Sequence, residues 1–267
     1  MNADSLQHDK ARIAAMFDSL AGEYDGERSW FSHFGWRLVE LAGVQPGHAV
    51  LDVATGQGAV LFPAATAAGS AGTVIGVDLS PAMVRQAAAE AARRGVTAEL
   101  QVMDAEHLSF PGRSFDRVCC AFGLMFFSRP GHVLRSIRRL LKRDGRLAVS
   151  TWRVHPLADL EQVLCELHFS SAAEELPFGS RDELEQLLWA AGFSTIQILP
   201  ETAQFAFSDV DHYWEAAMAT GMRPRLQRLD TCQVAVVRRL LAERLQTRTS
   251  CGRLHVGATA LLATASP

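Results

Sequence analysis

The stretch Ala49-Val50-Leu51-Asp52-Val53-Ala54-Thr55-Gly56-Gln57-Gly58-Ala59 decides the fold. Its apolar run lacks alternation, which is typical of a strand buried on both faces in a parallel sheet. Gly56 and Gly58 then form a turn where the backbone can approach a ligand closely, because glycine carries no Cβ. Residues 59–68 have a helical pattern, so the first N–H groups of this helix would point into the turn. Together these features predict a nucleotide-type pocket at the carboxyl end of a sheet.

The alternation of strand and helix continues through the middle of the chain. Ser80 and Pro81 indicate a helix start, as N-cap and first helical residue, and Gly95 indicates its end. Further strands are predicted at 73–77, 98–103, 115–122, 146–152, 195–207 and 254–265. We therefore expect an α/β fold with a doubly wound, mostly parallel sheet.

The organisation expected from this pattern is a single domain with helical additions. Residues 1–45 form an N-terminal helical cover and residues 46–152 the ligand-binding core. Residues 153–250 are helical insertions around the strand 195–207, forming a lid that completes a substrate pocket. Residues 251–267 supply the last strand of the sheet.

Composition excludes several classes of protein. The chain of 267 residues has a net charge of -3, which argues against a dedicated nucleic-acid binder. It has no apolar run long enough to span a bilayer, and its first residues lack the pattern of a signal peptide. The five cysteines have no metal-ligand spacing. We expect reduced cysteines, a cytoplasmic protein and no metal.

Three consecutive predicted strands end in an acid, at Asp52, Asp78 and Asp104. Asp78 follows Gly58 by about twenty positions, where an acid accepts hydrogen bonds from the hydroxyls of a ribose. Asp104 and Ala105 lie farther along the same edge, where a carboxylate and a backbone N–H can meet the polar edge of an adenine. Leu79 and Met83 would supply apolar contacts to the purine.

The glycine turn does not fit two common nucleotide motifs. The dinucleotide fingerprint requires glycine or alanine where this chain has Leu61, and the chain contains no Gly-Lys-Ser/Thr of a P-loop. An adenosine site without phosphates remains.

Several motifs in order resemble the class I S-adenosylmethionine-dependent methyltransferases. Within them the chain resembles the branch of ubiquinone/menaquinone-biosynthesis C-methyltransferases and small-molecule methyltransferases. The motifs lie at 50–58, 76–83, 104–111, 114–116, 121–124 and 142–147. The resemblance implies a Rossmann-like, seven-stranded sheet with a final antiparallel strand, and S-adenosylmethionine as the cofactor. Two departures are Ala54, in place of the first glycine of D-x-G-x-G-x-G, and Arg143-Asp144 in the usual Lys-Pro-Gly-Gly turn.

The resemblance also implies roles for individual residues. Asp52 would order the glycine loop, and the ribose would bind to Asp78 and the adenine to Asp104 and Ala105. The residues expected along the amino-acid part of the cofactor are Ala54, Thr55, Gly56, Gln57 and Gly58. Ala121 and Phe122 would face the sulfonium, and Tyr24 would cover the cofactor.

Methyl transfer is an in-line displacement, for which an enzyme mainly aligns the acceptor and excludes water. A general base would help an acidic acceptor. The histidines considered are His33, His107, His155, His168 and His212, and we take His155 with Asp159 as the candidate catalytic pair because they follow the fifth strand.

The acceptor is predicted to be a small, apolar molecule, a secondary metabolite or quinone-like compound. The reason is the Trp, Phe and Met content of the lid, at Trp152, Trp189, Phe205, Phe207, Trp214, Met218 and Met222. O- or C-methylation is favoured, because Phe122-Gly123-Leu124 stands where amino-directed relatives have Asn-Pro-Pro. We expect a monomer or homodimer. Two alternatives stay open: a nicotinamide oxidoreductase, which Leu61 disfavours, and an enzyme that keeps the cofactor structurally while cyclising a polyene.

Overall fold

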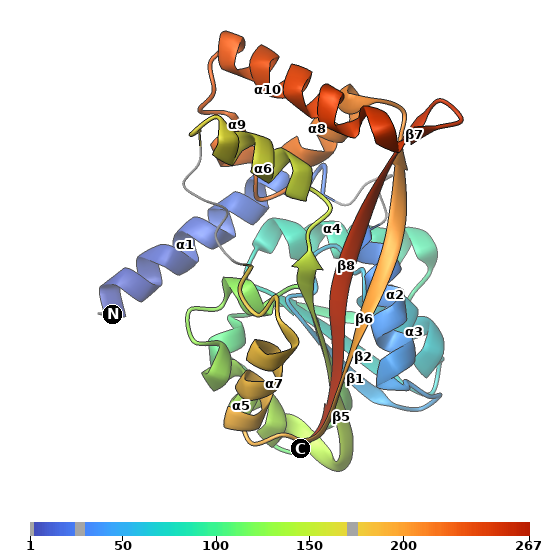
Figure 1. The fold of residues 1–267 in the computed structure, drawn as a ribbon. Coiled ribbons are helices and arrows are strands. Elements are labelled where there is room, and N and C mark those ends of the chain that lie inside the picture. Colours follow the sequence, from blue (N-terminus) through green and yellow to red (C-terminus); the bar gives the residue numbers. More distant parts are fainter. Residues whose placement is uncertain (1–2, 25–29, 170–175) are drawn as a thin grey trace.

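The computed structural model describes residues 3–24, 30–169 and 176–267 (Figure 1). One sheet organises it, with strand order β3-β2-β1-β4-β5-β8-β6, and β7 pairs with β8 off this path. Strands β1 to β5 pair in parallel, and β8 runs antiparallel to both β5 and β6. The strands are β1 (Ala49–Val53), β2 (Thr73–Asp78), β3 (Glu99–Val102), β4 (Phe115–Ala121), β5 (Leu141–Val154), β6 (Ser194–Phe207), β7 (Thr249–Ser250) and β8 (Arg253–Ser266). The predicted α/β fold and its antiparallel last strand are confirmed.

Helices cover both faces of the sheet. The helices α2 (Trp30–Ala42), α3 (Leu61–Ala68) and α4 (Pro81–Arg94) pack on one face, and α5 (Pro130–Leu140) and α7 (Arg181–Ala190) on the other. Cys119 and Cys120 show the division, because these adjacent residues of β4 are both fully buried but belong to different hydrophobic clusters. Both are free thiols, as expected from the sequence.

A second group of helices extends the fold beyond the carboxyl ends of the strands, at the top of Figure 1. It consists of α6 (Ala158–Glu166), α8 (Val210–Met218), α9 (Arg223–Leu226) and α10 (Thr231–Leu245). These helices share a hydrophobic cluster with α2 and the upper part of the sheet. The long helix α1 (Ala3–Leu20) crosses the same end of the molecule. The remaining short 3-10 turns are Ala105–His107, Leu124–Phe126 and Gln246–Arg248.

Local signals fix the borders of α4 as predicted. The hydroxyl of Ser80 accepts a hydrogen bond from the N–H of Met83 at 3.1 Å, and Pro81 is the first helical residue. At the other end Gly95 adopts a left-handed conformation with φ of 64°. This start places the N-terminus of α4 directly after Asp78, at the sheet edge that carries the acids.

Some borders differ from the sequence-based expectation. The helix after the glycine turn begins at Leu61 and not at residue 59, because 56–60 form turns. Strand β5 begins at Leu141, and an irregularity in its pairing with β4 absorbs the residues between Leu141 and Arg146. Residues 249–250 form β7 and not helix. Residues 170–175, part of the helical insertions expected over 153–250, lie outside the described residues.

Within the described ranges, the structure holds no helix with the length and apolarity that a bilayer crossing requires. The same residues contain no group of three or more His, Cys, Asp or Glu side chains placed to hold a metal ion.

Candidate functional site

A cavity of about 870 Å³ lies at the carboxyl edge of the parallel strands. Its described lining comes from α1, α2, α3, α4 and the loops after β1 to β4. All the residues predicted to bind a cofactor contribute to that lining: Tyr24, Asp52, Ala54, Thr55, Gly56, Gln57, Gly58, Asp78, Leu79, Met83, Asp104, Ala105, Ala121 and Phe122. The fold thus gathers segments that are up to about a hundred positions apart around one space.

Asp78 ends β2 and holds the glycine turn in place. Its Oδ2 accepts a hydrogen bond from the N–H of Gly56 at 2.8 Å, and its Oδ1 accepts one from the N–H of Ser80 at 2.9 Å. Burial raises the pKa of Asp78 and outweighs these N–H contacts, which lower it. The carboxylate therefore lies at the junction of the glycine turn and the N-terminus of α4.

Asp52 is buried beneath the same turn. The hydroxyl of Thr55 donates to its Oδ2 at 2.6 Å. Gly58 has a φ of 95°, and a Cβ at this position would lie 2.5 Å from the ring of Phe62. The positive φ therefore favours glycine at position 58, and any side chain there would also have to displace the ring of Phe62. Ala54 also has a positive φ, of 58°, at the position that the D-x-G-x-G-x-G pattern gives to glycine.

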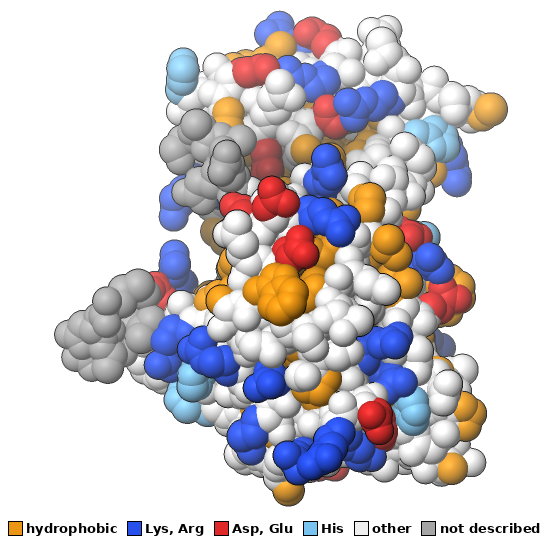
Figure 2. Space-filling view, turned by 60° about the horizontal axis from the view of Figure 1, so that its bottom comes forward, with side chains coloured by type: hydrophobic (Ala, Val, Ile, Leu, Met, Phe, Trp, Pro, Cys, Tyr) orange, Lys and Arg blue, Asp and Glu red, His pale blue; other side chains and the backbone are white. Residues whose placement is uncertain are grey.

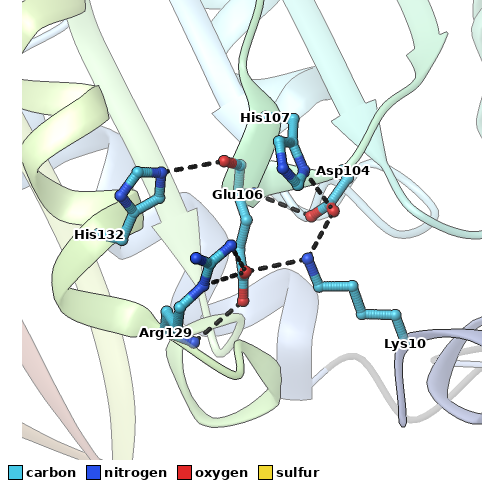
Figure 3. Close-up of polar contacts among 6 residues, drawn as sticks. All are labelled: Lys10, Asp104, Glu106, His107, Arg129 and His132. Carbon is cyan, nitrogen blue, oxygen red and sulfur yellow. Dashed lines mark hydrogen bonds and ion pairs between the residues drawn. The ribbon is translucent and has the colours of Figure 1, made fainter. Parts of the chain in front are cut away.

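An ionic network closes one end of the cavity (Figure 3). The Nζ of Lys10, on α1, lies 2.7 Å from the Oδ2 of Asp104 and 2.9 Å from the Oε2 of Glu106. Glu106 is buried and also pairs with Arg129. Burial would raise the pKa of Asp104 and of Glu106, but the hydrogen bonds from Lys10 and its neighbours outweigh burial and hold both pKa values below their ordinary range.

Lys10, Glu106 and Arg129 were not predicted from the sequence as members of the site. One signal was available, because Lys10 is one of only two lysines among the 26 Lys and Arg residues of the chain. Its partners lie 94 and 96 positions away, so only the tertiary structure reveals the contact.

Aromatic rings form another wall of the cavity. Tyr24 stacks on Phe31 with ring centroids 4.9 Å apart, and Phe31 meets Phe122 edge-on at 5.6 Å. Phe17, on α1, contacts both Tyr24 and Phe126. This wall comes from the N-terminal segments and the loop after β4.

The Trp, Phe and Met residues predicted to form the lid do not line the cavity. The prediction of an apolar acceptor was therefore based on the wrong residues. Most of them are core side chains: Trp152, Phe205, Phe207, Trp214 and Met222 are buried. Met218 packs against the same core, and Trp189 is exposed. The described residues beyond 128 contribute nothing to the lining.

The structure does not place the predicted catalytic pair at the cavity. His155 packs edge-on against Trp152, behind the aromatic wall, and burial lowers its pKa to about 4. Asp159 forms an ion pair with Arg248. The other histidines considered, His33, His107, His168 and His212, are also absent from the lining.

Exposed basic residues gather at the opposite end of the sheet. They lie on α5 and on the first part of β5, at Arg135, Arg138, Arg139, Arg143 and Arg146. Figure 2 looks toward that end and shows Lys and Arg side chains concentrated in its lower part. This positive surface is remote from the cavity.

Comparison with known proteins identifies the family. A family model described as a methyltransferase domain matches residues 50–145. The chain is 36% identical over 206 residues to the nocamycin O-methyltransferase of Saccharothrix syringae, covering 70% of this chain and 74% of that protein. It is 30% identical over 225 residues to a ubiquinone/menaquinone biosynthesis C-methyltransferase of Cellvibrio japonicus, covering 82% and 80%. The chain belongs to the S-adenosylmethionine-dependent methyltransferases.

Solved structures support the fold of this methyltransferase. The YcgJ protein of Bacillus subtilis aligns with a TM-score of 0.60 at 21% identity, covering 88% of this chain and 98% of that one. The [4+2]-cyclase SpnF aligns with a TM-score of 0.59 at 21% identity, covering 97% of both chains.

The residues of the cavity fit S-adenosylmethionine, the cofactor of the family. The carboxylate of Asp78 stands at the end of β2, and the backbone of the glycine turn is open to close approach, since a Cβ on Gly56 would meet nothing within 4 Å. The described lining contains no lysine or arginine in the glycine turn that would pair with phosphates. An uncharged adenosine with an amino-acid tail suits this lining better than a dinucleotide.

The burial of Asp52 predicts a pH-dependent stability. Burial, above all, raises its pKa to about 7, whereas an unfolded aspartate has a pKa of about 3.9. Between these values the folded state binds more protons, so stability falls as pH rises from about 4 to 7. Asp52→Asn removes this dependence. The measurement is the free energy of unfolding from urea titrations. We expect the value for Asp52→Asn minus that for the wild type to increase by roughly 2–3 kcal/mol between pH 5 and pH 8. A difference that stays constant over this range would contradict the assignment.

Proposed function

We propose that this methyltransferase transfers the methyl group of S-adenosylmethionine to the oxygen or carbon of a small, apolar acceptor of the secondary-metabolite or quinone type. The observation that carries the proposal is one cavity that joins the acid-bearing strand ends to an aromatic wall. Its volume of about 870 Å³ lies near the upper end of the range of about 300–1,000 Å³ for ligand pockets. The space therefore suits a cofactor and an acceptor side by side.

In this proposal the acids and the glycine turn hold the cofactor. Asp78 accepts the ribose hydroxyls, Asp104 and Ala105 meet the adenine, and residues 54–58 follow the amino-acid tail. Ala121 and Phe122 lie at the reacting end, and the ring of Tyr24 covers the cofactor. The bound cofactor supplies a methyl group on a positively charged sulfur, which an aromatic face attracts.

The acceptor lies against the rings of Phe31, Phe122 and Phe126. Two relatives support this class of acceptor. One is named a nocamycin O-methyltransferase. The other, 38% identical over 144 residues, is named an aklanonic acid methyltransferase of a Streptomyces species. No histidine belongs to the described lining, so the proposal includes no histidine base. Alignment of acceptor and methyl group, with exclusion of water, provides the rate enhancement.

The test is the mass of the product. The purified protein is incubated with S-adenosylmethionine and a panel of phenolic and quinone-like compounds, and products are analysed by mass spectrometry. We expect a product heavier by one methylene unit, together with S-adenosylhomocysteine in equal amount. An isomer of unchanged mass, formed without consumption of the cofactor, would overturn methyl transfer in favour of a structural use of the cofactor.

Phe31→Ala tests the acceptor wall. Loss of the ring removes apolar contact with the acceptor, so we expect KM for the acceptor to rise roughly tenfold with little change in kcat. Affinity for S-adenosylhomocysteine, measured by calorimetry on the same variant, should stay within about twofold of the wild type. Weakened cofactor binding with an unchanged acceptor KM would assign Phe31 to the cofactor instead.

A further inference from the structure

Lys10 lies in the middle of α1 and contacts two acids that follow strand β3. Its side chain is 11% exposed, and its ammonium group bridges the carboxylates of Asp104 and Glu106 (Figure 3). Burying a lysine in this way is costly unless both partners are well placed. The position of the helix therefore commits Lys10 to these two acids.

The hydrogen bonds of Asp104 leave part of its carboxylate available. Oδ1 accepts the N–H of Glu106 at 2.8 Å, and Oδ2 accepts from Lys10 and lies 2.9 Å from the Nδ1 of His107. An ionised carboxylate has about four acceptor positions, so one is left over. The side chain of Asp104 remains 24% exposed and lines the cavity. Lys10 thus fixes the orientation of the carboxylate without covering it.

Other contacts hold Glu106 and helix α1 independently of Lys10. Arg129 bonds to both carboxylate oxygens of Glu106, through its backbone N–H at 3.0 Å and its Nε at 2.9 Å. The far end of α1 is anchored because Asp18 accepts hydrogen bonds from the Ser80 hydroxyl at 2.6 Å and from the N–H of Ala82 at 3.0 Å. Loss of the Lys10 ammonium therefore leaves Glu106 paired and α1 attached.

We propose that Lys10 is a positioning residue for the cofactor: it holds Asp104 so that the remaining acceptor position of the carboxylate receives the exocyclic amino group of the adenine. The inference rests on the proposed placement of adenine at Asp104. If so, helix α1 takes part in recognising the purine. The preference for an amino group over an oxygen on the purine ring then depends on Lys10, which is 94 positions from Asp104 in the sequence.

The experiment compares two ligands that differ only at this position. S-adenosylhomocysteine carries the amino group, whereas S-inosylhomocysteine carries an oxygen there and a hydrogen on the adjacent ring nitrogen. Dissociation constants are measured by calorimetry for the wild type, Lys10→Met and Arg12→Met. Arg12 lies on the same helix with a side chain that is 75% exposed, and it serves as the matched control.

We expect the wild type to prefer S-adenosylhomocysteine by tenfold or more, on the order of one charged hydrogen bond. Lys10→Met should weaken this ligand by roughly tenfold and the inosyl ligand by less than about threefold, so the preference falls. Arg12→Met should leave both constants unchanged.

Three results would overturn the inference while leaving the cofactor site intact. Equal weakening of both ligands by Lys10→Met would show a structural role only. Tighter binding of S-adenosylhomocysteine would show that Lys10 competes with the adenine for the carboxylate. Unchanged dissociation constants for both ligands would show that the amino group is not recognised through this pair. Failure of the wild type to bind either ligand would instead overturn the cofactor site, and the inference with it.

Discussion

Replacing Asp78 with alanine is expected to weaken the binding of S-adenosylhomocysteine at least about a hundredfold. The two ribose hydroxyls lose a charged acceptor, and each such hydrogen bond contributes roughly 1.5–3 kcal/mol. The variant also frees the N–H groups of Gly56 and Ser80, which Asp78 now holds at 2.8 and 2.9 Å. Calorimetric titration of the purified variant measures the loss.

Two further variants separate these contributions. Asp78→Asn keeps the size of the side chain and one oxygen acceptor, so its affinity should lie between those of the wild type and Asp78→Ala. Asp144→Ala changes an exposed aspartate at the opposite end of the sheet and should bind as the wild type does. If the Asp78→Ala variant has a normal melting temperature and binds S-adenosylhomocysteine with undiminished affinity, the assignment of the ribose to Asp78 is wrong.

Trp152→Ala is expected to cost about 3–5 kcal/mol of stability, as large-to-small changes in a core do. The side chain is 2% exposed and stacks on Phe122 with ring centroids 4.0 Å apart. It also contacts Phe31 and Phe34, so its removal leaves a hole directly behind the acceptor wall. At roughly 2–4 °C per kcal/mol, the melting temperature should fall by at least about 6 °C.

The matched control is Trp189→Ala. This tryptophan on α7 is 56% exposed, so the same chemical change should alter stability by no more than about 0.5 kcal/mol. Both variants are followed by thermal unfolding monitored by circular dichroism. Equal effects of the two substitutions would contradict the assignment of Trp152 to the core.

The parts of the site that follow directly from a strand could be predicted from the sequence. Asp52, Asp78 and Asp104 each come at the end of a predicted strand, and parallel strands place such ends at one edge. The two ends of α4 could also be predicted, because Ser80, Pro81 and Gly95 act within one or two turns of the helix. Local chemistry and the order of elements were therefore enough for the fold and for the three acids at the cavity. Tyr24, Ala121 and Phe122 were expected only from the family resemblance, and they line the same cavity.

The remainder depended on packing that no local pattern reveals. A tryptophan or phenylalanine has the same pattern on its helix or strand whether it fills a core or a pocket, so Trp152 and Phe205 were assigned to the wrong environment. Lys10 was missed because its partners are set by the direction in which α1 crosses the sheet. His155 does follow the fifth strand, as predicted, but its ring packs against Trp152 and not into the cavity. Side-chain packing decides this, and the sequence does not show it.

The place of β8 in the sheet has a consequence for the order in which the protein is made. This strand is inserted between β5 and β6, where Leu147 pairs with Ala265 and Ile198 with Ala263. A ribosome produces β1 to β5 about a hundred residues before β8, so the half of the sheet that carries the glycine turn can pair during translation. Strand β6 emerges without its neighbour and must wait for β8, with an apolar face and unpaired backbone groups exposed. The topology thus allows a stage in which β1 to β5 have paired while β6 still exposes an edge that favours aggregation.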